Sequence, residues 1–405
     1  MLDAPWEPLW TILLLIAGSV YLIVLNRVRS GIFNLRVLEN ARLNRDGLFS
    51  VSIIIPCRNE AKHVGAALDD LAAQDYPADL IQVIVVDDRS TDGTGDAARS
   101  RRDKLPGLSV LSIESCPANV SPKKNAILRG LREAQGEIII TTDGDCRFQP
   151  GWIRSLVSGF AADVGVVTGL TIFDRQGREP LWQRLQQLDY LSHSFFASGA
   201  IGSGLAFNCN GSNLALRRQA FEDVGGYEQF RQVITGDDTL LLQKIRRSGK
   251  WRIHFSVQPD SLVRSWPEET PKQVLNQRLR WGSGGLSYSR DAMALALSTF
   301  VFFLMLFLSP FLLLGGLISS AWLIPLALKI VQEGRVMSAG WKIFGLKPLR
   351  VLRPQWTKFA LLELIHIPAI LTFSIGGHLL GFQWKGEHFK RTRTKTVELS
   401  GTVHS

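Results

Sequence analysis

The sequence predicts an α/β domain with a doubly wound sheet, flanked on both sides by helices that cross a membrane. Two observations lead to this prediction. Between about Phe49 and Trp281, short β-branched runs alternate with segments of helical periodicity. On either side, the chain contains apolar runs of a length that suits a lipid bilayer. The 405 residues are enough for a complete domain and these additional segments.

The first apolar run, LWTILLLIAGSVYLIVL at residues 9–25, is uncharged and long enough to cross a bilayer core of roughly 30 Å. A signal peptide is the alternative, but acidic residues precede this run and its positive charges follow it. Arg27, Arg29 and Arg36 place the following segment on the cytoplasmic side by the positive-inside rule. We therefore expect residues 1–30 to form a membrane anchor with its N-terminus outside.

A second apolar run, at residues 292–331, has no charge before Lys329 and is too long for one span of about 20 residues. We expect a transmembrane helical hairpin that turns near residues 310–316. The basic segment that follows, residues 332–358, is expected in the cytosol or at the membrane interface.

The last apolar segment, residues 359–382, contains Glu363 and His366, and ionisable residues inside a membrane usually face protein or water. If this segment crosses the membrane, the basic tail at residues 383–405 lies outside, against the positive-inside tendency. A re-entrant or interfacial helix would avoid that conflict. The pattern therefore allows three or four spans.

The formal net charge of +10 permits contact with phosphates or an anionic membrane surface, although basic charge alone is weak support for either. We expect a lipid bilayer as a partner, and no nucleic acid. The cysteines have no CxxC spacing, so we interpret them as reduced thiols of a cytosol-facing domain, and not as a disulfide framework or a zinc site: Cys57, Cys116, Cys146 and Cys209.

The expected cytosolic domain, residues 49–285, begins with strands and helices in alternation. VSIIIP, IQVIVVDD and EIIITTD are short apolar runs typical of buried parallel strands. Helical segments separate them, AKHVGAALDDLAAQ before the second run and KNAILRGLREAQG before the third. A sheet of this kind binds its ligands beyond the carboxyl ends of its strands.

Carboxylates follow the strands at this edge. Asp143 and Asp145 come directly after the third strand. Asp87 and Asp88 end the second strand, and Glu60 follows the first. A single such aspartate is often a helix cap, but three acidic strand ends favour a ligand site. Because close carboxylates need a compensating cation, and Mg²⁺ and Mn²⁺ bind carboxylates together with phosphates, the pattern favours a metal-bound nucleotide diphosphate.

Six motifs in order resemble those of the family 2 glycosyltransferases: VSIIIPCRNE, VIVVDDRSTDGT, SPKKNAI, TTDGDC, TGDDTLL and QRLRW. The resemblance covers roughly Val51 to Trp281. It is closest to the membrane-bound inverting branch that includes hyaluronan, cellulose and poly-N-acetylglucosamine synthases.

The resemblance implies a GT-A-like mixed sheet and a nucleotide-diphospho-sugar donor, most often a UDP-sugar. Asp88, or its neighbour Asp87, would bond the base, and Lys123 would lie near the diphosphate. The family's usual glycine before this lysine is Pro122 here, which leaves Lys124 as an alternative. The further donor-site residues, the last two of which would bind Mg²⁺ or Mn²⁺, are Pro56, Asn59, Glu60, Asp143 and Asp145.

Inverting transfer needs a base that takes the proton of the acceptor hydroxyl. In VITGDDTLLLQKIRRSG, Asp237 and Asp238 stand at the start of an expected helix. The resemblance places the base at Asp238, with Asp237 as a supporting neighbour where the family usually has Glu. A carboxylate that caps the helix and stabilises its dipole is the structural alternative.

Two further motifs match the family. NCNGSNLALRR resembles a loop near the donor sugar and acceptor, with Gly211 and Asn213 at the matching positions, although such a string is otherwise a turn. QRLRW supplies Gln277, Arg280 and Trp281 on one helix. The arginine would stabilise the leaving diphosphate and the indole would face a sugar ring. Trp281 alone would also suit an aromatic anchor at the membrane surface.

The segment EPLWQRLQQLDYLSHSFF, residues 179–196, has apolar residues at helical spacing, with arginine and glutamine opposite. This pattern is typical of an amphipathic helix in the membrane interface. It is equally typical of a surface helix that packs on its own domain.

The sequence therefore indicates a membrane-bound inverting glycosyltransferase of the bacterial plasma membrane, with a cytosolic catalytic domain. The QxxRW motif and the C-terminal spans favour extension of a β-linked glycan. Single transfer to a membrane lipid, as in the sphingolipid glucosyltransferases that share these motifs, is the alternative. A membrane-anchored nucleotide-sugar-binding module without turnover is a third alternative, but it would not need to keep Asp238 or Arg280.

Overall fold

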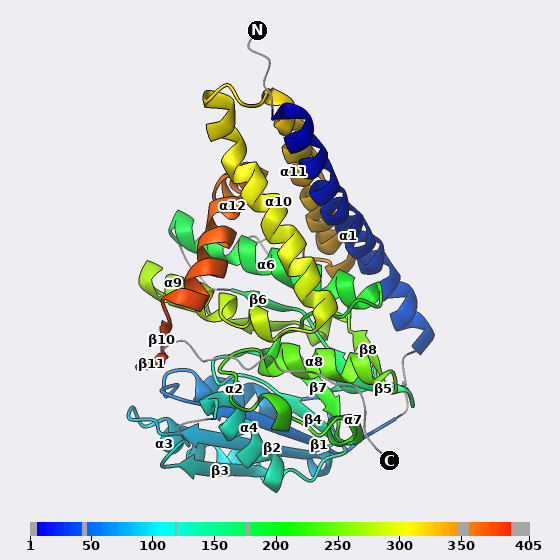
Figure 1. The fold of residues 1–405 in the computed structure, drawn as a ribbon. Coiled ribbons are helices and arrows are strands. Elements are labelled where there is room, and N and C mark those ends of the chain that lie inside the picture. Colours follow the sequence, from blue (N-terminus) through cyan, green and yellow to red (C-terminus); the bar gives the residue numbers. More distant parts are fainter. Residues whose placement is uncertain (1–5, 43–46, 118–119, 175–178, 347–355, 390–405) are drawn as a thin grey trace.

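The computed structural model describes residues 6–42, 47–117, 120–174, 179–346 and 356–389. They form an α/β domain from which a bundle of long helices rises (Figure 1). The domain contains a seven-stranded sheet with the strand order β3-β2-β1-β4-β7-β5-β8. Its strands are β1 (Val51–Cys57), β2 (Ile81–Asp88), β3 (Leu108–Ile113), β4 (Ile138–Thr141), β5 (Val164–Thr168), β7 (Leu214–Arg217) and β8 (Arg252–Phe255).

Helices cover both faces of this sheet, which explains why its central strands are apolar throughout. Helices α2 (Val64–Ala72) and α5 (Trp152–Val157) pack on one face. Helix α4 (Pro122–Glu133) packs on the other, against β1 and β2. Strand β7 runs antiparallel between β4 and β5. The predicted α/β fold with a doubly wound, mixed sheet is confirmed.

The strand register brings the polar segments to one rim. Strands β1, β2 and β4 are parallel, and Cys57 at the end of β1 pairs with Asp87 near the end of β2. The segments that follow these strands therefore emerge side by side. The remaining elements of the domain are α3 (Thr94–Arg99), β6 (Thr171–Phe173), α6 (Leu181–Gly202), α7 (Arg218–Asp223), α8 (Asp237–Ser248), β9 (Val263–Ser265) and α9 (Pro271–Gly282).

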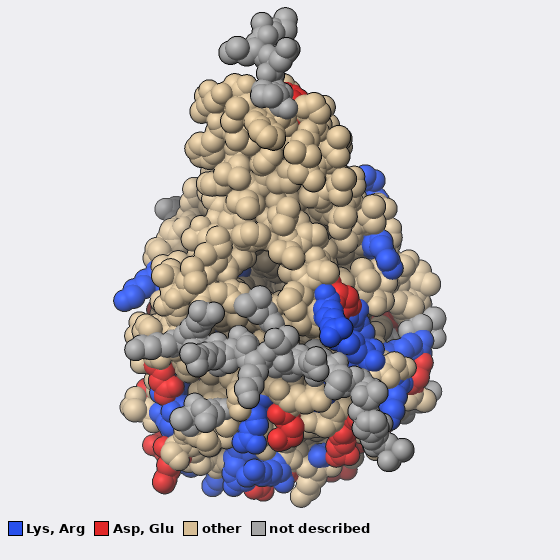
Figure 2. Space-filling view, in the orientation of Figure 1, with Lys and Arg blue, Asp and Glu red and all other residues tan. Residues whose placement is uncertain are grey.

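The bundle consists of α1 (Glu7–Arg42), α10 (Arg290–Leu314), α11 (Leu323–Phe344) and α12 (Trp356–Leu379). Within the described residues, three helices are long and apolar enough to cross a membrane, namely α1, α10 and α12. Figure 2 shows that charged side chains are rare on the visible face of the bundle and gather over the domain below it. This distribution is compatible with a bundle that contacts lipid.

The helices after α9 differ in their bounds from those expected. Pro310 lies inside α10, and the chain reverses only after Leu314. Helix α11 continues past residue 331 to Phe344 and takes in the first part of the expected basic segment 332–358. It can do so because buried Lys329 pairs with Glu333 at 2.9 Å and with Glu363 of α12 at 2.5 Å, so that these charges compensate each other inside the bundle. Residues 347–355 lie outside the described part.

Two more segments answer questions that the sequence left open. Helix α6 packs against α1, and its glutamines Gln183 and Gln187 are buried, which favours a helix packed on its own protein over one lying in the membrane interface. Where a basic tail was expected from residue 383, a β-hairpin forms instead, with strands β10 (Phe382–Trp384) and β11 (Glu387–Phe389). Residues 390–405 lie outside the described part.

Candidate active site

A cavity of about 1280 Å³ lies at the carboxyl ends of β1, β2 and β4, and it is also lined by α9, α12 and the start of α8. This volume exceeds the range of about 300–1,000 Å³ that is usual for one small ligand, so it has room for a donor and an acceptor together. Most of the predicted site residues line it: Pro56, Asn59, Glu60, Asp88, Lys123, Asp143, Asp145, Gly211, Asp237, Asp238, Gln277, Arg280 and Trp281.

Two predicted residues, Asp87 and Asn213, are not among those that line the cavity. Asp87 accepts a hydrogen bond from the backbone of the turn that follows β2. Asn213 is fully buried and accepts a bond from the Trp152 indole at 3.0 Å. Its amide group donates to the carbonyl oxygens of Leu170 and Ser261. Asn213 thus connects three backbone segments beside the site.

The loop after β4 carries the acidic pair Asp143 and Asp145. Between them, a Cβ atom on Gly144 would lie 2.6 Å from the Cys57 sulfur, so the close approach of this loop to β1 requires glycine. Burial, together with the negative charges of Asp143 and Glu60, raises the pKa of Asp145 to about 7. The loop therefore holds negative charge that the surrounding protein compensates only in part.

A divalent cation would supply the missing charge. Asp143, Asp145 and Cys146 each offer a ligand atom, and these atoms lie within 4.8 Å of one another. Mg²⁺ and Mn²⁺ prefer carboxylate oxygen to sulfur. Burial also raises the pKa of the Cys146 thiol well above its usual value, as does the charge of Asp145. The residues that fit such an ion are thus Asp143 and Asp145.

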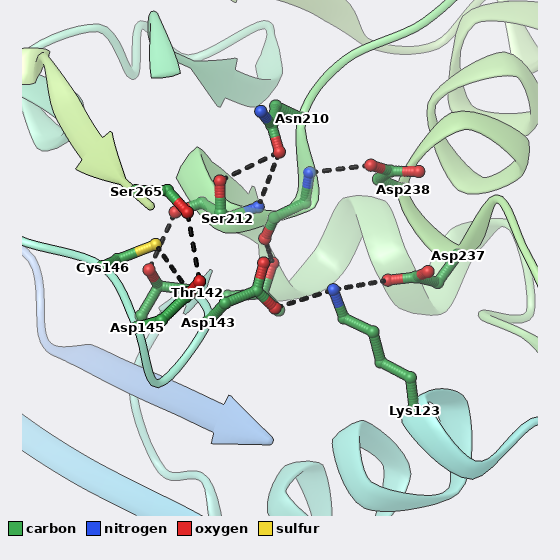
Figure 3. A network of polar contacts seen from close by, with 12 residues as sticks. Lys123, Thr142, Asp143, Asp145, Cys146, Asn210, Ser212, Asp237, Asp238 and Ser265 are labelled. Atoms are coloured by element: carbon green, nitrogen blue, oxygen red, sulfur yellow. Dashed lines mark hydrogen bonds and ion pairs between the residues drawn. The ribbon is translucent and has the colours of Figure 1, made fainter. Parts of the chain in front are cut away.

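Lys123 connects the acidic loop to α8 (Figure 3). Its ammonium group lies 2.8 Å from an Asp143 oxygen and 3.8 Å from an Asp237 oxygen. Burial would lower the pKa of Lys123, but these two carboxylates outweigh it and raise the pKa. Lys124 is fully buried and donates to the carbonyl oxygens of Val233 and Thr235 instead. Of the two lysines, Lys123 is therefore the one whose charge faces the cavity.

The two aspartates at the start of α8 have different environments. Asp238 accepts hydrogen bonds from the backbone nitrogens of Gly211 at 2.7 Å and Thr239 at 2.6 Å. Burial, and then the charge of Asp237, raise the pKa of Asp238. Burial acts in the same direction on Asp237, but Lys123 and Lys124 outweigh it and lower its pKa. The pair thus combines a permanently charged carboxylate with a more basic one, as general-base catalysis requires.

Helix α9 brings the QxxRW residues to the other side of the cavity. The Thr270 hydroxyl caps the helix by accepting a bond from the Gln273 nitrogen at 3.3 Å. Gln277 donates to a carboxylate oxygen of Glu268 at 2.8 Å. The Arg280 Nε is buried and has no hydrogen-bond partner within the described chain. An anionic ligand in the cavity would satisfy this group.

Sequence reasoning missed the β10–β11 hairpin, whose residues Trp384 and Lys385 line the cavity. The Lys385 ammonium bonds the Glu60 carboxylate. Glu387 accepts bonds from Arg58 and Arg89, each at 2.7 Å. The signal in FQWKGEHF was weak. Gly386 suits a two-residue hairpin loop, but Lys385 stands where such loops usually have Asn, Asp or Gly, and it takes a positive φ of 48°.

The mixed, doubly wound sheet, whose rim carries an acidic pair, a facing lysine and a separate carboxylate, is a GT-A-like fold. Residues 52–225 match the family model named Glycosyl transferase family 2. This match covers less than half of the chain and identifies a stretch that is similar to family 2 glycosyltransferase domains. Together with the similar sequences below, it supports an enzyme of the hexosyltransferase type.

Two similar sequences carry names in keeping with this assignment. The beta-monoglucosyldiacylglycerol synthase of Synechocystis is 25% identical over 82% of this chain and 69% of its own length. The protein named "Probable glycosyltransferase YdaM" of Bacillus subtilis is 27% identical over 62% of this chain and 58% of its own length.

Among solved structures, the mannosyltransferase PcManGT of Pyrobaculum calidifontis, in complex with GDP-Man and Mn²⁺, is similar with a TM-score of 0.54. The similarity covers 90% of this chain and 99% of that chain, at 16% sequence identity. It shows a shared fold.

Proposed function

We propose that this protein transfers a hexose from a nucleotide-diphospho-sugar to a hydroxyl group of a membrane lipid, with inversion at the anomeric carbon and in a metal-dependent reaction. One observation carries this proposal. The cavity that contains the acidic loop and Asp238 is also lined by Ile370 and Phe373 of α12, a helix apolar enough to cross a membrane. Donor chemistry and a membrane segment thus share one site.

The donor side of the site suits a sugar nucleotide, with a UDP-sugar expected from the family resemblance. Asn59 and Asp88 line the cavity at the ends of β1 and β2, where the nucleoside would lie, and the Asp88 carboxylate is held by Arg89 at 2.8 Å. Asp143 and Asp145 would hold Mg²⁺ or Mn²⁺, which neutralises the diphosphate when bound. The PcManGT complex with GDP-Man and Mn²⁺ supports this arrangement by analogy. Lys123 and Arg280 add positive charge beside the same phosphates.

The transfer step assigns a role to each side of the cavity. The acceptor oxygen attacks the anomeric carbon while its proton passes to Asp238. The bond from that carbon to the phosphate oxygen breaks, and its electron pair leaves with the diphosphate. Asp237 remains charged and holds Lys123 in place across the site. A base positioned in this way accelerates such a step by about 10²–10⁴-fold.

A lipid acceptor is favoured by two further observations. The Synechocystis relative, which is similar over most of this chain, is named for glycosylation of diacylglycerol. In addition, the described chain has three helices apolar enough to span a membrane, which is few for a wide export channel. The cytosolic placement of the domain is supported by Arg27, Arg29 and Arg36, which follow the apolar part of α1.

Extension of a β-linked glycan is the second candidate. It is favoured by Gln277, Arg280 and Trp281, which complete the QxxRW motif of the polysaccharide synthases on one wall of the cavity.

Incubation of the purified protein in lipid vesicles with a panel of labelled sugar nucleotides and Mg²⁺ or Mn²⁺ tests these proposals. We expect label in an organic extract, in a product that carries one sugar. Label in a water-soluble polymer would support the second candidate instead. No incorporation from any sugar nucleotide would contradict both.

A further inference from the structure

The cavity extends beyond Asp143, Asp145 and Asp238 to a second region, which we call the upper region. The inference below concerns this region and rests on the proposed lipid acceptor. The donor residues lie near β1 and β2, whereas α12 belongs to the bundle above the domain (Figure 1). The residues of this upper region combine hydroxyl groups with apolar side chains: Ala197, Thr235, Tyr288, Ile370, Phe373 and Ser374.

The hydroxyl part of this region, Thr235 and Tyr288, lines the same cavity as Asp238. Tyr288 stands between α9 and α10, and a Cβ atom on Gly284 would lie 2.8 Å from the Thr235 hydroxyl and 3.7 Å from the Tyr288 hydroxyl. Both hydroxyls therefore lie near Gly284. Thr235 stands three residues before Asp238 in the chain. Burial and the charge of Asp238 raise the pKa of Tyr288 to about 12, so it stays a hydrogen-bond donor at neutral pH.

The apolar part is formed by α12 and α6. Helix α12 packs with its backbone directly on α9, where a Cβ atom on Gly282 would lie 2.3 Å from the Phe373 carbonyl oxygen. This close contact holds Ile370 and Phe373 at the wall of the cavity, which Ala197 of α6 also lines. On its outer side α12 exposes Leu364 and Ile375, by 75% and 49%, as a lipid-facing helix does.

We propose that this upper region is the acceptor site, and that it takes an amphiphile whose hydroxylated head group is held by Tyr288 beside Asp238 while its apolar part lies along Ile370 and Phe373. A purely polar acceptor would place polar groups against these two apolar side chains, which line the cavity. An acceptor without a free hydroxyl would offer the Tyr288 hydroxyl no hydrogen-bonding group and Asp238 no proton to take. The combination therefore selects a lipid with a small hydroxyl head group.

The test uses the full-length protein in detergent micelles, with 1,2-dioctanoylglycerol as acceptor probe and the sugar nucleotide that the wild type accepts. Tyr288→Phe removes one hydroxyl, and we expect kcat/KM for the acceptor to fall about tenfold, as for the loss of one hydrogen bond of about 1.4 kcal/mol, with unchanged donor affinity. Ile370→Trp fills the apolar part and should raise the acceptor KM by a similar factor. Ile375→Trp is the matched control on the outer side of the same helix and should change neither value.

Donor affinity, measured by titration calorimetry, shows that each variant is folded. Equal acceptor kinetics in Ile370→Trp and Ile375→Trp, or wild-type kinetics in Tyr288→Phe, would overturn the acceptor site while the proposed function stands. A wild-type enzyme that glycosylates soluble glycans but no dioctanoylglycerol would overturn the lipid acceptor itself, and this site with it.

Discussion

Asp145 and Asp238 differ in the chemistry that their surroundings impose, although both are aspartates in one cavity. Asp145 lies next to Asp143 and Glu60, and burial together with their negative charges raises its pKa, so a bound cation would stabilise its charged form. Asp238 is held by two backbone nitrogens and lies next to a second carboxylate, so its affinity for a proton is increased. These environments distinguish the proposed metal ligand, Asp145, from the proposed base, Asp238.

Asp145→Ala should weaken donor binding in the presence of Mg²⁺ or Mn²⁺ about tenfold or more, because one of two carboxylate ligands is lost. Titration calorimetry with the sugar nucleotide at limiting and saturating metal measures this loss. Asp79→Ala, at an exposed aspartate away from the cavity, is the control. Unchanged donor affinity at both metal concentrations would remove Asp145 from the metal site.

The raised pKa of Asp238 predicts a pH dependence of transfer. A base must be deprotonated, so kcat/KM should rise with pH through the pKa of Asp238, at a pH above the ordinary aspartate value of about 3.9. Asp237→Asn removes a neighbouring negative charge and should move this acid limb to lower pH. An acid limb that stays in place in this variant would show that Asp238 does not determine it.

At the scale of elements, two segments at the ends of the long helices bind the α/β domain through buried or partly buried polar contacts. The β10–β11 hairpin follows α12 directly and places Lys385 on Glu60. Near the C-terminal end of α1, Glu39 is buried and bonds His254, Ser256 and the backbone of Val257 beside β8. Segments at both ends of the described chain thus pack on the domain.

Lys385→Met should weaken donor binding by about tenfold, since it removes a positive charge near the diphosphate position and leaves Glu60 without its partner. Lys250→Met, at an exposed lysine, is the matched control. The measurement is the donor KM of both variants. Equal values would mean that the hairpin contributes nothing to the donor site.

Glu39→Ala should destabilise the protein by about 2 kcal/mol or more, because the Val257 nitrogen and His254 then lose their buried partner. Thermal unfolding in detergent measures this effect against Glu114→Ala at an exposed position. Indistinguishable melting temperatures would contradict the role of this contact in attaching α1 to the domain.

At the scale of the whole molecule, local patterns predicted the sheet and most of the rim. Strands such as β1 and β4 are read directly from their apolar runs, and their parallel order brings Glu60 and Asp143 together. The bounds of α11 were not predictable in this way, because Lys329 and Glu363 compensate each other only after two helices pack. The contact between Lys385 and Glu60 likewise depends on how the chain returns to the site after α12.

The proposed transfer mechanism depends on Asp238 acting as base across the cavity from a metal-bound donor. Asp238→Asn keeps the size of the side chain and removes the proton acceptor, so the most direct test compares transfer and donor binding in this one variant. We expect transfer to fall by at least about 10²-fold, with the sugar-nucleotide affinity in Mg²⁺ or Mn²⁺ retained. Full transfer activity in Asp238→Asn would contradict the proposed role of Asp238 as the base.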